Sequence, residues 1–128
     1  MNDLSKSLEE IDGENWGDPD SGETGLIRKC LALRKKPLKD FTNDDLTRMI
    51  LQQIALEYLV PIAINRLYNN PLNSGDYYRG DLLCSLLQIN KEFWLECPDL
   101  QHGLDVVLDD LNDAVETVNE FLAKYKET

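Results

Sequence analysis

Apolar residues recur along most of this chain at steps of three and four, the spacing that places them on one face of an α-helix. A short first helix is expected around Leu4, Leu8 and Ile11, followed by a glycine-rich loop over residues 13–25. A second helix should follow and end at Pro37. Its apolar face is expected to comprise Leu26, Ile27, Cys30, Leu31 and Leu33. No useful length of strand-like alternation is present, so the pattern predicts an all-α fold.

The clearest helix start in the middle of the chain is at Thr42. A capping hydroxyl there is followed three residues later by the carboxylate of Asp45, directly before an apolar run that continues to Leu67. Pro61 lies inside this run and has no backbone N–H to donate, so a kink or a break near Glu57 is expected.

A long last helix is expected after Pro98, which fits the first turn of a helix. Its apolar positions alternate in steps of four and three: Leu104, Leu108, Leu111, Val115, Val118, Leu122 and Tyr125. Such a seam either seals the core of its own domain or pairs two chains. In a domain of this size the first interpretation is favoured, and with it a monomer.

A chain of 128 residues suits one compact domain, here of about five to seven helices with a long amphipathic helix at the C-terminus. The expected domain, 1–128, has three parts: an acidic helix and glycine-rich loop (1–25), a helical core (26–98) and an acidic C-terminal helix (99–128). The N-terminus shows no apolar segment typical of a secretion signal, and the apolar stretch 56–64 is too short to span a bilayer.

The charge of the chain limits the classes of partner that it can bind. The net charge is −11, and the acidic excess lies in the first 24 and the last 30 residues. Such a surface repels phosphates, which argues against direct nucleic-acid binding. On the last helix the acids form one stripe opposite the apolar seam: Asp105, Asp109, Asp113, Glu116 and Glu120. Like charges four residues apart destabilise a helix, so either this is simply a solvated face or a basic partner compensates the cost.

Candidate chemistry is sparse. The single histidine, His102, lies in an expected Gln-His-Gly turn and is interpreted as a solvated surface residue. No Cys or His spacing suits a metal, so no metal, cofactor or catalytic residue is expected, and the cysteines are expected to be free thiols. Asp76 and Asp81 form the one carboxylate pair that an enzyme could use. The favoured alternative makes Asp81 a residue at or near a helix N-cap.

Several segments together resemble the immunity proteins of bacterial contact-dependent growth inhibition (CDI), the CdiI-type family. They span most of residues 16–94 and read Trp-Gly-Asp-Pro (16–19), Leu-Arg-Lys-Lys-Pro-Leu (33–38), Phe-Thr (41–42), Gln-Gln (52–53), Tyr-Leu-Val-Pro-Ile-Ala (58–63), Gly-Asp-Tyr-Tyr (75–78) and Gly-Asp-Leu-Leu (80–83). The residues assigned to the scaffold by this resemblance are Trp16, Gly17, Arg34, Pro37, Leu38, Gln53, Pro61, Gly75, Asp76, Tyr78, Gly80 and Asp81.

The resemblance implies a cytoplasmic protein, not an enzyme, that binds the toxic C-terminal domain of a surface-displayed CDI effector in a 1:1 complex. Those domains are commonly nucleases, and one that cleaves tRNA is favoured here. A nuclease needs a basic cleft, which an acidic inhibitor can block. The expected contact residues are the acidic stripe of the last helix and, as weaker candidates, Asp12, Glu14 and Asp18. The alternatives are an acidic helical adaptor for another basic protein and the small enzyme.

Overall fold

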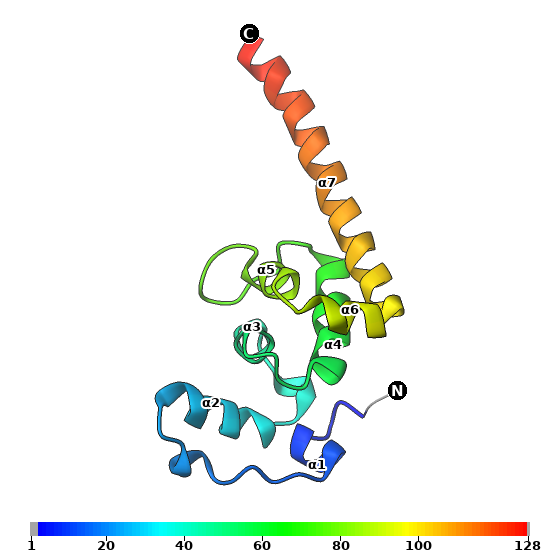
Figure 1. The fold of residues 1–128 in the computed structure, drawn as a ribbon. Coiled ribbons are helices and arrows are strands. Elements are labelled where there is room, and N and C mark those ends of the chain that lie inside the picture. The colour runs from blue at the N-terminus through cyan, green and yellow to red at the C-terminus, as the bar shows by residue number, and fades with distance from the viewer. Residues whose placement is uncertain (1–2, 128) are drawn as a thin grey trace.

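The computed structural model describes residues 3–127, and the elements in this range are helical (Figure 1). The α-helices are α1 (Leu8–Asp12), α2 (Gly25–Arg34), α3 (Asn43–Leu51), α4 (Leu56–Asn69), α5 (Asp81–Leu87), α6 (Lys91–Glu96) and α7 (Pro98–Glu127), and 3-10 turns lie at Pro19–Ser21 and Leu38–Asp40. Seven helices without a strand in the described range confirm the predicted all-α fold with its long C-terminal helix.

The core is formed mainly by α3, α4 and α5, with α7 packed against α4. Its fully buried side chains include Leu46, Met49, Ile50, Leu59, Val60, Leu67, Leu82 and Leu86. Leu26 and Ile27, expected on the buried face of the second helix, are instead 40% and 44% exposed, so α2 turns only its C-terminal half into the core.

Capping residues define the start of α3 and the end of α1. At the start of α3, Thr42 Oγ1 accepts a hydrogen bond from the Asp45 N–H, and Asp45 Oδ2 accepts one from the Thr42 N–H, both at 3.0 Å. This capping box confirms the predicted start. Gly13 ends α1 in the left-handed conformation with φ 73°, which glycine adopts without strain, so the predicted stop is also confirmed. Leu4, expected in the first helix, lies outside it and is exposed.

The predicted interruption of the central helix is present, but Pro61 does not form it. The chain leaves the helix after Leu51, and Gln53 and Ala55 take positive φ values of 58° and 53° before α4 begins. Pro61 lies inside α4, where the missing N–H removes one hydrogen bond without ending the helix. The change of direction therefore occurs at two non-glycine residues in the left-handed region.

Helix α7 begins at Pro98, as predicted, and runs without interruption through residues 101–103, so the expected turn at His102 is wrong. Gly103 lies where α7 crosses α4, and the absence of a side chain leaves room there: a Cβ at this position would lie 2.8 Å from the Tyr68 hydroxyl oxygen and 3.2 Å from Ile64 Cγ2. Leu104 and Val107 are buried against the body.

Beyond Leu111 the helix projects away from the rest of the molecule (Figure 1), and every described residue from 112 to 127 is exposed. The interpretation in which the whole apolar seam seals the core is therefore wrong for its second half. Among the described residues, no helix combines the length and apolar character that a bilayer crossing requires.

Two of the four leucines of α5 provide a test of this core. Leu82 is fully buried and Leu87 is 53% exposed on the same helix. We expect Leu82→Ala to lower the free energy of unfolding by about 2–5 kcal/mol, because it removes buried methyl groups and leaves a cavity, and Leu87→Ala to lower it by less than about 1 kcal/mol. Urea unfolding followed by circular dichroism measures both, and equal losses would contradict the described packing.

Candidate functional site

The acidic stripe predicted from the sequence lies on the solvent-facing side of α7. Asp105, Asp109, Asp113, Glu116 and Glu120 are all exposed, and within residues 3–127 none of their carboxylates forms an ion pair. Three of them, Asp113, Glu116 and Glu120, lie on the half of α7 that projects beyond the body. The helix thus presents a row of unneutralised negative charge to solvent.

Four acids in other parts of the described chain, Glu9, Asp12, Asp44 and Asp45, form internal ion pairs. Lys35 Nζ lies 3.0 Å from Glu9 Oε2, and Lys36 Nζ lies 2.7 Å from Asp45 Oδ2. The Asp45 carboxylate is buried, which alone would raise its pKa, but the hydrogen bonds from Lys36 and from the Thr42 N–H hold the pKa below its usual value. Lys35 and Lys36, which follow α2, therefore neutralise acids of the same domain.

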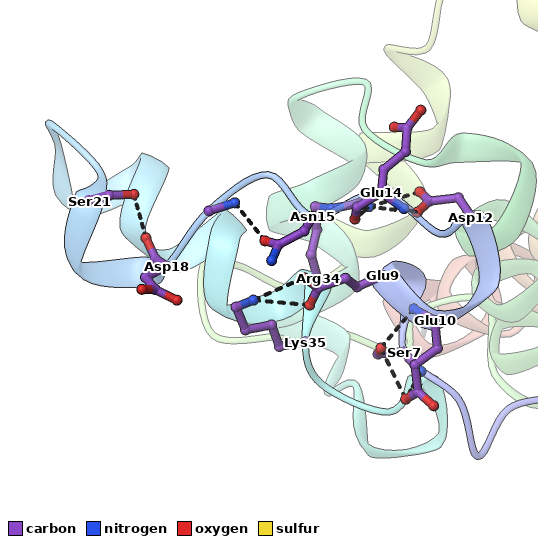
Figure 2. Close-up of polar contacts among 11 residues, drawn as sticks. Ser7, Glu9, Glu10, Asp12, Glu14, Asn15, Asp18, Ser21, Arg34 and Lys35 are labelled. Carbon is purple, nitrogen blue, oxygen red and sulfur yellow. Dashed lines mark hydrogen bonds and ion pairs between the residues drawn. The ribbon is translucent and has the colours of Figure 1, made fainter.

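The most buried of these pairs joins α2 to the N-terminal segment (Figure 2). The Arg34 guanidinium donates to Asp12 Oδ1 and Oδ2 at 2.8 and 2.9 Å and to the Glu14 carbonyl oxygen at 2.9 Å. Its centre lies 4.1 Å from the Trp16 ring centroid, a cation–π distance. The Arg34 side chain is only 4% exposed, so Asp12, Glu14 and Trp16 surround a buried charge and engage its Nη2 and its planar face, while Nε has no hydrogen-bond partner within residues 3–127.

The three weaker contact candidates thus differ from the stripe on α7. Asp12 is engaged by Arg34, and its pKa is lowered because hydrogen bonds from the Glu14 N–H and from Arg34 outweigh the opposing effect of burial. Glu14 Oε2 accepts from Trp16 Nε1 at 3.3 Å, while Asp18 is exposed beside the 3-10 turn. Figure 1 places this N-terminal segment and the projecting end of α7 at opposite ends of the molecule, so the candidates do not form one surface.

The loop before α5 holds the carboxylate pair considered for catalysis. Asp81 is 1% exposed; its Oδ1 accepts from the Gly75 N–H at 2.8 Å and its Oδ2 from the Tyr77 N–H at 3.2 Å. The N-cap of α5 is Gly80, in the left-handed conformation with φ 86°, and Asp81 is the first residue of the helix. Asp81 therefore holds the preceding loop and does not cap its own helix through its side chain.

Asp76 is exposed at the edge of an open cavity of about 550 Å³ that residues 70–79 line. Gly75 beside it packs against α3, where an added Cβ would lie 2.9 Å from the Asp44 Cα atom. Among the described residues, no three His, Cys, Asp or Glu side chains gather as metal ligands. The buried Asp81 and the solvent-facing Asp76 have distinct environments, and only Asp76 is available to solvent.

An apolar cavity of about 190 Å³ beside α2 was missed by the sequence analysis. Its lining residues are Trp16, Leu26, Ile27, Cys30, Leu31, Gln52 and Ile54. Helical periodicity places Leu26 and Ile27 on an apolar face but does not say whether another element covers that face. Gln52 lies in the interruption after α3, which carries no glycine or proline to signal it.

The sequence also matches a known protein family. A family model described as CDI immunity proteins matches residues 10–104. Because this match covers most of the chain, the protein belongs to the family of CDI immunity proteins. Searches of curated proteins and of solved structures found no match. The matched segment includes Arg34 with its partners Asp12, Glu14 and Trp16 (the Arg34 cluster) and residues 75–81, which the Asp81 carboxylate holds (the Asp81 loop). It ends at Leu104, one residue before the acidic stripe begins.

The Arg34 cluster yields a stability prediction. Arg34→Ala should lower the free energy of unfolding by about 1–3 kcal/mol, because it removes the partner of Asp12 and the hydrogen bond to the Glu14 carbonyl. Lys35→Ala, which breaks the more exposed pair with Glu9, should cost less than about 1 kcal/mol. Urea unfolding at neutral pH compares them, and a larger loss for Lys35→Ala would contradict the assigned roles.

The capping box yields a pH prediction. The pKa of Asp45 is lowered in the folded state, so the unfolded state binds more protons and stability falls as the pH drops below about 4. Asp45→Asn removes this titrating group, so its unfolding free energy should be lower at neutral pH and should fall less steeply in acid. Urea unfolding across this pH range tests it; an equally steep acid loss in both proteins would refute it.

Proposed function

We propose that this protein is the immunity partner of a CDI toxin and that it binds the toxin's C-terminal domain through the acidic face of α7. The observation that carries the proposal is the row of five exposed carboxylates, which form no ion pair with any described residue, on a helix that extends beyond the body. Membership of the immunity family supplies the class of partner. One immunity chain engages one toxin domain in the cytoplasm, where the toxin would act.

The toxin is proposed to be a nuclease, with tRNA as its substrate. A nuclease holds the phosphate backbone with lysine and arginine side chains, so its cleft is complementary to an acidic helix. The stripe would then exclude nucleic acid by steric and electrostatic blocking, without chemistry by the immunity protein itself. Complementary fields would also speed capture of the toxin, by about 10- to 1000-fold at low salt.

The position of the stripe outside the family match supports its role in choosing the partner. An immunity protein must discriminate its own toxin from related ones, and discrimination needs contact residues that differ between relatives. The matched segment holds the buried Arg34 cluster and the Asp81 loop, whose contacts are internal to the fold. The stripe makes no such internal contacts, so it can change without loss of the core.

The test uses the purified C-terminal toxin domain of the cognate CDI effector. Asp109→Asn, Asp113→Asn, Glu116→Gln and Glu120→Gln are combined in one variant, and Glu57→Gln, Asp76→Asn, Glu92→Gln and Glu96→Gln form a control with the same change in charge at other exposed acids. We expect the stripe variant to associate at least about tenfold more slowly at low salt and to lose the salt dependence, while the control changes little.

A tRNA cleavage assay on the same samples reports inhibition. Failure of the unmodified protein to bind or inhibit the toxin domain would overturn the proposed function. Unchanged binding by the stripe variant would leave the partner in place but move the interface away from α7. Helix content, measured by circular dichroism, should not fall in the stripe variant, because neutralisation removes like-charge repulsion along α7.

A further inference from the structure

The projecting half of α7 carries an uncovered apolar stripe as well as the acidic one. Val115, Val118 and Leu122 are 48%, 64% and 41% exposed, although they continue the seam that Leu104 begins inside the body. The seam keeps a strict seven-residue repeat from Leu104 onward. Apolar residues repeating every 3.5 positions form the contact surface of coiled coils, and a repeat kept over three heptads holds that surface toward one partner helix.

The charge pattern around this stripe shows which kind of partner it suits. In residues 112–127, the positions that flank the seam in such a repeat are Asn112, Ala114, Asn119, Phe121 and Lys126, none of them acidic. The acids of this half lie on the outer positions of the helix instead. Flanking charges set partner choice in coiled coils. If the seam bound a basic partner, we would expect acidic residues at these flanking positions.

A partner with the same strong negative charge requires the opposite arrangement, flanks free of acid, and this is the arrangement found. Each copy of the chain carries a net charge of −11, so two copies can approach along this face and keep their acids on the outside. We propose that the seam of α7 binds the seam of α7 in a second copy of this chain. This proposal differs from the monomer expected from the sequence.

Length and packing support the same occupant. The part of α7 beyond Leu111 rises about 1.5 Å per residue and so extends about 24 Å from the body. An isolated helix of this length is marginal in water, and this half receives no packing from the body. Pairing would cover its apolar side. The short free seam predicts a dimer that dissociates on dilution, with both acidic faces pointing outward.

The test measures the mass of the full chain by sedimentation equilibrium over a wide range of concentrations. Val118→Glu places a charge in the seam, and Val106→Glu places the same charge on an exposed valine of the same helix outside the seam. We expect a concentration-dependent dimer for the unmodified chain and for Val106→Glu, and a monomer for Val118→Glu. Val118 contacts nothing in the core, so the fold should persist, and Trp94 fluorescence checks this.

A monomer at every concentration for the unmodified chain, or a dimer of equal strength for Val118→Glu, would overturn the proposal. If the unmodified chain is monomeric and Val118→Glu instead weakens binding of the toxin domain, the apolar seam belongs to the toxin interface. The outcome is independent of the proposed function, since the mass is measured without toxin.

Discussion

The crossing of α4 and α7 at Gly103 sets the direction of everything that follows it. The two helices approach so closely there that a Cβ at this position would meet Tyr68 and Ile64. With Leu104 and Val107 buried on the next turn, the first part of α7 is held rigidly against the body. A straight helix continues along the line that its anchored end defines, so the crossing places residues 112–127 in solvent with the acidic side and the apolar side both uncovered.

This arrangement separates stability from recognition within one small protein. The core of α3, α4 and α5, the Arg34 cluster and the Asp81 loop lie within the segment matched to the CDI immunity family, and their polar groups are engaged by one another. The projecting half of α7 contributes little to that core. Its charges and apolar side chains can therefore serve partners, which is the basis of both the proposed toxin contact and the proposed pairing of two chains.

Signals that act within a few residues were the predictable part of the fold. The Thr42 capping box, the stop at Gly13 and the start at Pro98 each depend on hydrogen bonds or backbone angles of adjacent residues. Gly103 was misjudged because glycine usually interrupts helices, whereas here the absence of a side chain permits a contact with a helix distant in sequence. The interruption at Gln53 and Ala55 has no such local signal at all.

The candidate site was predictable in its pattern but not in its surroundings. Periodicity placed the five acids on one face of the last helix, yet it could not show that the opposite face loses its cover after Leu111, because that depends on where α4 ends. Likewise, the choice of Asp12 and Trp16 as the partners of Arg34 depends on how the loop of residues 13–25 returns to α2, which no local pattern indicates.

Hydrogen–deuterium exchange of the protein with and without the toxin domain tests the central claim most directly. Amides on the projecting half of α7 lack packing against the body and should exchange quickly in the free protein, measured at a concentration low enough to keep it monomeric. If the acidic face holds the toxin, binding should slow exchange over residues 105–120 and leave the N-terminal segment of residues 12–18 unchanged. Protection confined to the N-terminal segment or to the loop of residues 70–80, with α7 unaffected, would contradict the account.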